Sequence, residues 1–332
     1  MKVSNDNSVT PQTGRKLLLA LALVASAARP AAAVPVYLAL GDSITFGETD
    51  LTYVPSLGDR GYVSRFADTL ASRNGGTRPS VINLAIDGET ASSFMTNAGR
   101  TPPVQGRADG PLQLENLHYT NNAVSQGTLL ASTVAAQVAA GNTISTVSLT
   151  LGFNELAALA PAQNTPAAEA AAIARIPATI AAFRASYAAV LSEIRSLAPS
   201  ANLYALGYYN PFPADPASPA APVFAAGGTL LNAAIQDVAA QFNGIYVDNA
   251  APFVGHEAQY TYQAVLPAGS TVGGLYGGVL PIGNVHPNSV GYDVIAADVA
   301  AATPVPVPEP ASLLLLLAPL GAVALARSRR HG

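Results

Sequence analysis

Residues 34–50, VPVYLALGDSITFGETD, join an apolar run directly to a polar turn. The run at 36–40 is short and rich in aliphatic residues, which is typical of a strand buried on both faces. It ends at Gly41, Asp42 and Ser43, and these residue types form turns readily. The stretch therefore has two interpretations: an ordinary turn, or a nucleophilic Ser43 held at the end of a strand.

The residues that follow repeat the strand signal with helical patterns between. Four more apolar runs lie at 80–85, 146–151, 202–207 and 244–247. Helical spacing of apolar residues appears at 61–76, at 176–199 with Pro177 expected in the first turn, and at 288–301. The alternation predicts an α/β protein, a three-layer α/β/α sandwich with a mostly parallel five-stranded sheet. Ligands bind at the carboxyl ends of such strands, which is where Ser43 lies.

Composition excludes several classes of function. Of the 332 residues, 50% are hydrophobic and 11% are charged, which predicts one sizeable core rather than a disordered chain. The net charge of -4 gives no basic footprint, so no nucleic-acid partner is expected. The chain has no cysteine, which excludes disulfides, thiolate metal sites and a cysteine nucleophile.

The first 33 residues are typical of a secretory signal peptide. Arg15 and Lys16 precede the apolar run LLLALALVASAA, and small residues follow it. Cleavage is expected after Ala33, with Ala27 as the second choice. A retained membrane anchor is the alternative, but the apolar run is shorter than the ~20 residues that span a bilayer.

Residues 304–332 have the pattern of a second targeting segment, at the C-terminus. A Pro-rich linker at 304–310 precedes an apolar segment at 311–326, and Arg327, Arg329 and Arg330 follow it. This order resembles the PEP-CTERM sorting signal, which an exosortase-type enzyme of the Gram-negative inner membrane recognises. The resemblance implies export across that membrane, a transient C-terminal anchor, and a final place at the cell surface or outside the cell. An ordinary tail anchor is the alternative.

Four short blocks lie in the central region, residues 34–303. They are GDSITFG at 41–47, NLAIDGET at 83–90, LTLGFNEL at 149–156 and NVHPNSVGY at 284–292. In this order they resemble the GDSL family, also called SGNH hydrolases. The resemblance implies a flavodoxin-like fold and a secreted serine esterase that needs no metal and no cofactor.

The resemblance assigns a role to one residue in each block. Ser43 is the nucleophile, and His286 is the general base that removes its proton. The oxyanion hole consists of the backbone N–H groups of Ser43 and Gly88 with the side-chain amide of Asn154. The simpler alternatives are a turn serine, a turn glycine, a helix-capping asparagine and a loop histidine. The Gly-x-Ser-x-Gly pattern of α/β-hydrolases is absent around Ser43, and Asp42 is interpreted as a brace for the loop.

The sequence departs from the family pattern most clearly before the histidine. The family has an Asp three residues before it, where this chain has Gly283. Such an Asp orients the imidazole and stabilises its charge. Three substitutes remain open: a backbone carbonyl near Gly283, which would leave a Ser–His dyad and is preferred; the amide oxygen of Asn284; or a carboxylate from elsewhere, such as Asp248 or Glu257.

Two milder departures concern the first and third blocks. Ile44 replaces the Leu that names the family, and Glu155 stands where many members have Asp.

The substrate is expected to be an ester, and family members act on lipid esters, simple acyl esters and acetylated sugars. The sorting signal favours extracellular polysaccharide. Tyr208, Tyr209 and Phe212 are expected either to line the site or to pack in the core, and residues 108–138 to form a loop and a helix near it. The competing hypothesis is a surface binding or matrix protein on a catalytically impaired fold of this kind.

Overall fold

The computed structural model describes residues 33–47, 61–86, 88–96, 124–163, 165–261 and 285–303. The described strands form one five-stranded sheet in the order β2-β1-β3-β4-β5, and every pair is parallel. The strands are β1 (Pro35–Gly41), β2 (Ser80–Asn83), β3 (Thr143–Thr150), β4 (Asn202–Leu206) and β5 (Ile245–Val247). This is the flavodoxin-like strand order, so the predicted fold class is confirmed.

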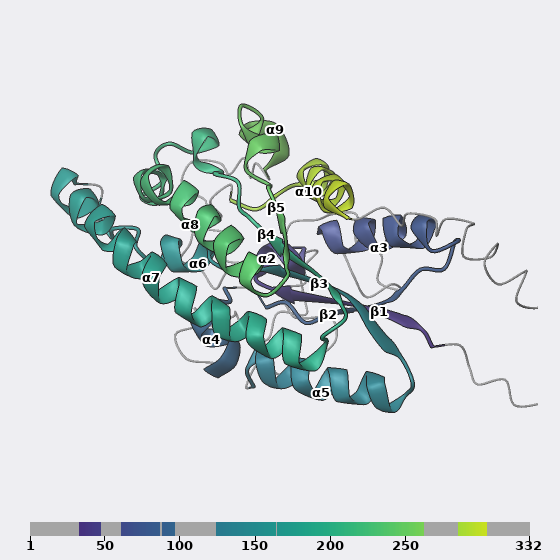
Figure 1. Ribbon diagram of the computed structural model, residues 1–332. Helices are drawn as coiled ribbons and strands as arrows, with labels where there is room; N and C mark the ends of the chain where they lie inside the picture. Colours follow the sequence, from purple (N-terminus) through teal and green to yellow (C-terminus); the bar gives the residue numbers. More distant parts are fainter. Residues whose placement is uncertain are drawn as a thin grey trace, which may run out of the picture.

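Helices cover both faces of the sheet (Figure 1). On one face, α3 (Gly61–Arg73) packs against α10 (Ser289–Ala302). The other face carries α5 (Gln126–Ala139), α7 (Pro166–Leu197) and α8 (Ala221–Gln241). Parallel strands need crossover connections, and the helices in such connections pack back onto the sheet. The predicted three layers are therefore present.

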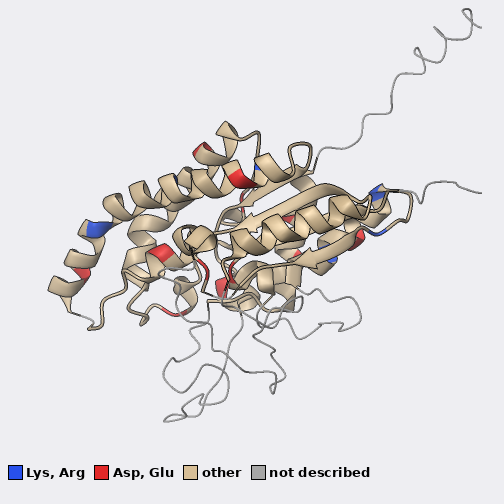
Figure 2. Ribbon diagram, turned by 90° about the horizontal axis from the view of Figure 1, so that it is seen from below, with Lys and Arg blue, Asp and Glu red and all other residues tan. Residues whose placement is uncertain are grey.

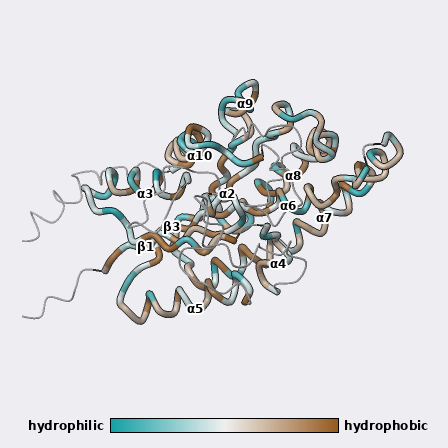
Figure 3. Tube along the Cα trace, turned by 180° about the vertical axis from the view of Figure 1, so that it is seen from behind, coloured by the Kyte–Doolittle hydropathy of each residue, from teal (hydrophilic) through white to brown (hydrophobic). Residues whose placement is uncertain are grey.

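The core is built around the central strands β1 and β3. Residues 36–40 of β1 are all 0% exposed, which explains why this run shows no alternation of polar and apolar residues. Figure 3 shows hydrophobic colouring on β1. Charged side chains are few and scattered over the described surface (Figure 2).

The prediction for α7 was wrong at its N-terminus. The helix begins at Pro166, after Thr165, whose hydroxyl accepts a hydrogen bond from Ala168 N at 3.3 Å. Pro177 lies inside the helix, not in its first turn. A Thr cap followed by Pro is a strong start signal. The interior proline loses one backbone hydrogen bond, but the buried stripe that includes Ile176 and Ile180 continues past it.

The end of β1 requires a glycine. Gly41 has φ +119, and a Cβ atom there would lie 2.0 Å from the carbonyl oxygen of Thr150 on β3. The next residue, Asp42, donates its backbone N–H to the same oxygen at 3.0 Å. The chain then enters the one-turn helix α2 (Ser43–Phe46), which Asp42 caps. The close approach of β1 and β3 therefore fixes where α2 begins, and with it the position of Ser43.

Residues 1–32 of the expected signal peptide and the segment from residue 304 onwards lie outside the described residues. Within the described ranges, α8 is the one helix whose length and apolar composition would suffice to cross a membrane. One side of α8, including Val223, Leu231 and Ile235, is buried. The helix packs against α7, β4 and β5, so core packing accounts for its apolar composition.

Candidate active site

The structure brings Ser43 and His286 together from opposite ends of the chain. Ser43 opens α2 at the carboxyl edge of the sheet and is 7% exposed. The Nε2 atom of His286 lies 2.9 Å from Ser43 Oγ. A hydroxyl that donates to a neutral imidazole can lose its proton as the oxygen attacks an electrophile. This arrangement is therefore capable of nucleophilic chemistry.

The segments carrying Gly88 and Asn154 also adjoin each other. Gly88 follows β2 with φ +73, a conformation that favours glycine. Asn154, in α6 (Phe153–Ala157), donates its Nδ2 to the carbonyl oxygen of Glu89 at 2.8 Å. A side-chain amide has two N–H groups, so one remains for a ligand. All four predicted site residues thus lie on segments at the same edge of the sheet.

The carboxylate of Asp42 faces the protein interior. It is 0% exposed, and Oδ1 accepts hydrogen bonds from Ile44 N at 3.1 Å and Thr150 Oγ1 at 2.8 Å. Oδ2 accepts from the Tyr208 hydroxyl at 2.5 Å. Burial and the nearby Asp42 carboxylate raise the pKa of Tyr208, which therefore stays a neutral donor. The interpretation of Asp42 as a brace agrees with these contacts.

A chain of buried hydroxyl groups extends from this brace into the core. Thr45 Oγ1 lies 2.8 Å from Thr150 Oγ1 and 2.8 Å from the Tyr62 hydroxyl. Ser148 Oγ lies 2.9 Å from the Tyr62 hydroxyl and 2.7 Å from the Tyr37 hydroxyl. Each hydroxyl can donate one hydrogen bond and accept others. This chain of hydroxyl groups ties α2 to α3 and to the two central strands, and no local pattern in the sequence indicates it.

Gln126, the first residue of α5, joins the serine turn to the glycine turn. Its Oε1 accepts from Gly41 N at 2.6 Å, and its Nε2 donates to Gly41 O at 2.9 Å and to Glu89 Oε2 at 3.0 Å. Glu89 is 0% exposed and also accepts from the Ser93 hydroxyl. The predicted helix within residues 108–138 is confirmed as α5, whereas residues 108–123 lie outside the described residues. No spacing in the sequence pairs position 126 with position 41.

The segment that carries His286 is held on both sides. The Tyr209 hydroxyl donates to Val285 O at 2.5 Å. On the other side, Asn288 donates its backbone N–H to Tyr260 O at 2.9 Å and caps α10. These contacts fix the backbone before and after the imidazole, which places its ring against Ser43.

Burial lowers the pKa of His286 to about 4, so the imidazole is neutral at higher pH. The predicted partners Gly283 and Asn284 lie outside the described residues. The other alternative, a carboxylate, is contradicted for both candidates, because neither hydrogen bonds to His286. Asp248 accepts from Ala250 N at 2.8 Å, and Glu257 accepts from Gly255 N at 3.1 Å.

Glu155 holds the segment next to the glycine turn. Its Oε1 accepts from Ala91 N, the first residue of α4 (Ala91–Thr96), at 2.6 Å. Its Oε2 is buried and has no hydrogen-bond partner among the described residues. Burial raises the pKa of Glu155 to about 7. Asn154 and Glu155, which are adjacent in α6, thus hydrogen bond to the backbone of Glu89 and Ala91.

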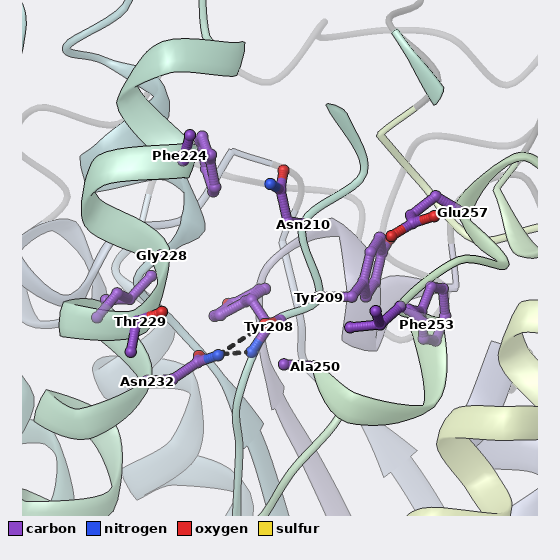
Figure 4. A pocket seen from close by; sticks show the side chains of 13 residues that line it. Tyr208, Tyr209, Asn210, Phe224, Gly228, Thr229, Asn232, Ala250, Phe253 and Glu257 are labelled. Atoms are coloured by element: carbon purple, nitrogen blue, oxygen red, sulfur yellow. Dashed lines mark hydrogen bonds between the residues drawn. The ribbon is translucent and has the colours of Figure 1, made fainter. Parts of the chain in front are cut away.

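The three aromatic residues named by the sequence are all buried in the core, and two of them also line a pocket. Tyr208 and Tyr209 line a pocket beside the site (Figure 4). Phe212 packs against Phe224, with ring centroids 5.0 Å apart. Within the described ranges, no group of three or more His, Cys, Asp or Glu side chains is arranged to hold a metal ion.

The chain is similar to one known family. The model of the GDSL-like Lipase/Acylhydrolase family matches residues 39–294, which include all four sequence blocks. A search of curated proteins found no match.

Solved structures share the fold at low identity. An extracellular lipase from Streptomyces rimosus is 23% identical with a TM-score of 0.50, covering 81% of this chain and 100% of its own. The lipase Lip_vut3 from a goat rumen metagenome is 18% identical with a TM-score of 0.50, and the match covers 81% of this chain and 97% of the lipase. Phospholipase A1 from Streptomyces albidoflavus NA297 is 21% identical with a TM-score of 0.48, and the match covers 80% of this chain and 100% of the phospholipase.

Replacing Glu155 with Gln should change how stability depends on pH. The folded state raises the pKa of Glu155 from 4.5 to about 7, so it holds the proton more tightly than the unfolded chain. The stabilising contribution of Glu155 is complete below pH 4.5 and is lost as the pH rises to 7. Between pH 5 and 8, the wild-type free energy of unfolding should fall by about 2 kcal/mol relative to Glu155→Gln.

Urea denaturation at the two pH values measures this difference. Glu193→Gln on α7 is the matched control and should follow the wild type. An unchanged difference between wild type and Glu155→Gln across this range would contradict the assignment.

Proposed function

The chain belongs to the GDSL-like lipase/acylhydrolase family and is an ester-bond hydrolase, and we propose that Ser43 and His286 perform the hydrolysis through an acyl-enzyme. The observation that carries the proposal is the 2.9 Å separation between His286 Nε2 and Ser43 Oγ. A hydroxyl needs such a base to become a useful nucleophile.

The reaction proceeds in two halves. Ser43 Oγ attacks the ester carbonyl carbon while His286 Nε2 takes its proton. The negative oxygen that forms is stabilised by the backbone N–H groups of Ser43 and Gly88 and by the free N–H of Asn154. His286 then gives the proton to the departing alcohol, leaving Ser43 acylated. Water, activated by the same histidine, releases the acid.

Backbone contacts take the orienting role that an Asp has in the usual triad. The Tyr209 hydroxyl holds Val285 O and the Tyr260 carbonyl holds Asn288 N–H, so the backbone on either side of the imidazole is fixed. An Asp would also stabilise the imidazolium that forms during the reaction. Burial of the ring lowers the pKa of His286, which keeps the imidazole neutral before the reaction.

Ser43→Ala should abolish hydrolysis of p-nitrophenyl acetate, with kcat falling by at least about a thousandfold. Asn154→Ala should lower kcat by about a hundredfold with little change in KM, because the lost donor acts on the oxyanion. Ser132→Ala, which changes an exposed serine on α5, is the control. Full activity in Ser43→Ala would overturn the proposal, and an inactive wild type would favour the surface binding or matrix protein.

Activity should persist well into the acid range. His286 must be neutral to accept the proton, and burial lowers its pKa from 6.5 to about 4. Therefore kcat/KM should rise with pH to a plateau with its midpoint near pH 4. A pH-stat assay measures this profile, with circular dichroism to verify that the protein stays folded. A midpoint at 6.5 or above would contradict a buried, neutral base.

We also propose that the protein is exported and sorted to the cell surface. Support comes from the order of segments in the sequence: the charged and apolar run within residues 1–33, and the Pro-rich, apolar and Arg-containing parts of residues 304–332. An exosortase-type enzyme would be the partner of the second segment. Mass spectrometry of protein secreted by a Gram-negative host should find a new N-terminus after Ala33, and an intact residue 1 would contradict export by cleavage.

A further inference from the structure

We propose that the pocket beside the site, here called the α8 pocket, binds an uncharged sugar ring of an acylated oligosaccharide substrate. This inference rests on the proposed function, and it names the substrate class. The α8 pocket is lined on one side by Tyr209, Asn210 and Glu257, and on the other by Phe224, Gly228 and Thr229 of α8 (Figure 4). Ser43 and His286 do not line it, so the ring would be a neighbour of the one that carries the ester.

The location couples the α8 pocket to the proposed catalytic residues. Tyr208 and Tyr209 follow β4 at the carboxyl edge of the sheet and form part of the wall. Their hydroxyls reach Asp42, next to Ser43, and Val285, next to His286. One tyrosine side chain therefore connects the wall of the pocket to each of these two segments.

The pocket is held in shape before a ligand arrives. The side chain of Asn232 accepts from Tyr208 N and donates to Tyr208 O, both at 2.8 Å. The Tyr209 ring stacks on Phe253, with centroids 4.0 Å apart and planes at 13°. A wall fixed in this way lowers the ordering cost of binding.

The size of the α8 pocket suits a single ring. Its volume is about 210 Å³. Such a volume holds one sugar ring with its hydroxyls, whereas a long acyl chain would have to extend out of it.

The polar groups of the pocket match hydroxyls that both donate and accept. Asn210 uses its Oδ1 for Phe212 N at 3.1 Å, and its Nδ2 has no partner among the described residues. Within the same ranges, the Thr229 hydroxyl is unbonded, and Glu257 uses only Oε1, for Gly255 N at 3.1 Å. An apolar chain would cover these groups without pairing them, at a cost in free energy. The Tyr209 and Phe224 rings provide apolar surface for the C–H face of a sugar.

Charge excludes an anionic ligand. Glu257 is the only charged residue among the described ones that line the pocket, and it is acidic. A phosphate group would be repelled by this carboxylate and would find no Arg or Lys to pair with there. The chemistry therefore favours a neutral carbohydrate over a phospholipid headgroup.

Gly228 provides a way to fill the pocket without strain. A Cβ atom added at Gly228 would meet no atom within 4 Å, and the residue lies inside α8. Gly228→Leu should therefore occupy the pocket and leave the helix intact, since Gly is a poor helix former. Ala233→Leu adds the same kind of bulk to an exposed position of α8 and is the matched control.

The test compares kcat/KM on partially O-acetylated cello-oligosaccharides with kcat/KM on p-nitrophenyl acetate, which has no sugar. In Gly228→Leu the ratio of the two values should fall at least about tenfold, whereas Ala233→Leu should keep the wild-type ratio. An unchanged ratio in Gly228→Leu would overturn the proposal. A selective loss on p-nitrophenyl palmitate instead would also overturn it, because the occupant would then be an acyl chain.

Direct binding separates failure of this proposal from failure of the proposed function. Saturation-transfer NMR with cellobiose on the full chain should show contact in wild type and in Ser43→Ala, and should lose it in Gly228→Leu. Contact of this kind in a protein without esterase activity would support the sugar site while refuting the catalytic proposal. Equal signals in all variants, or no signal in any, would refute the sugar site.

Discussion

The carboxylate of Asp42 lies beneath Ser43 with no exposure to solvent, and it accepts hydrogen bonds from groups on α2, on β3 and after β4. Burying a charged carboxylate without partners would be very costly, so these donors must stay in place for the protein to fold. The same requirement fixes α2 relative to the sheet. The hydrogen bonds that the buried Asp42 carboxylate requires therefore also hold Ser43 in position.

Glu89 repeats this arrangement on the other side of the site. It is also fully buried, and Gln126 binds both its carboxylate and the backbone of Gly41. Two buried acids and one amide thus hold the serine turn and the glycine turn as one unit. A preorganised oxyanion site needs such rigidity, because its donors must already point at the developing charge. The base, by contrast, is positioned by backbone contacts of the residues beside His286.

Sequence alone could predict the parts that depend on local pattern. The five apolar runs, the helical spacing between them and the order of the four blocks were sufficient for the fold and for the expectation that Ser43 and His286 meet. Contacts between distant residues have no local pattern, so Gln126 and the hydroxyl chain through Tyr62 were not found. Local preference places Pro177 in a first turn, because proline is common there. Packing of the buried stripe of α7 outweighed that local preference.

The most direct test of the account is whether His286 controls the reactivity of Ser43. A fluorophosphonate probe forms a covalent adduct with an activated serine, and mass spectrometry identifies the residue that carries it. The account predicts one adduct, on Ser43, and a labelling rate that falls by at least about a hundredfold in His286→Ala. Adduct formation in Ser43→Ala, or an unchanged rate in His286→Ala, would contradict the account.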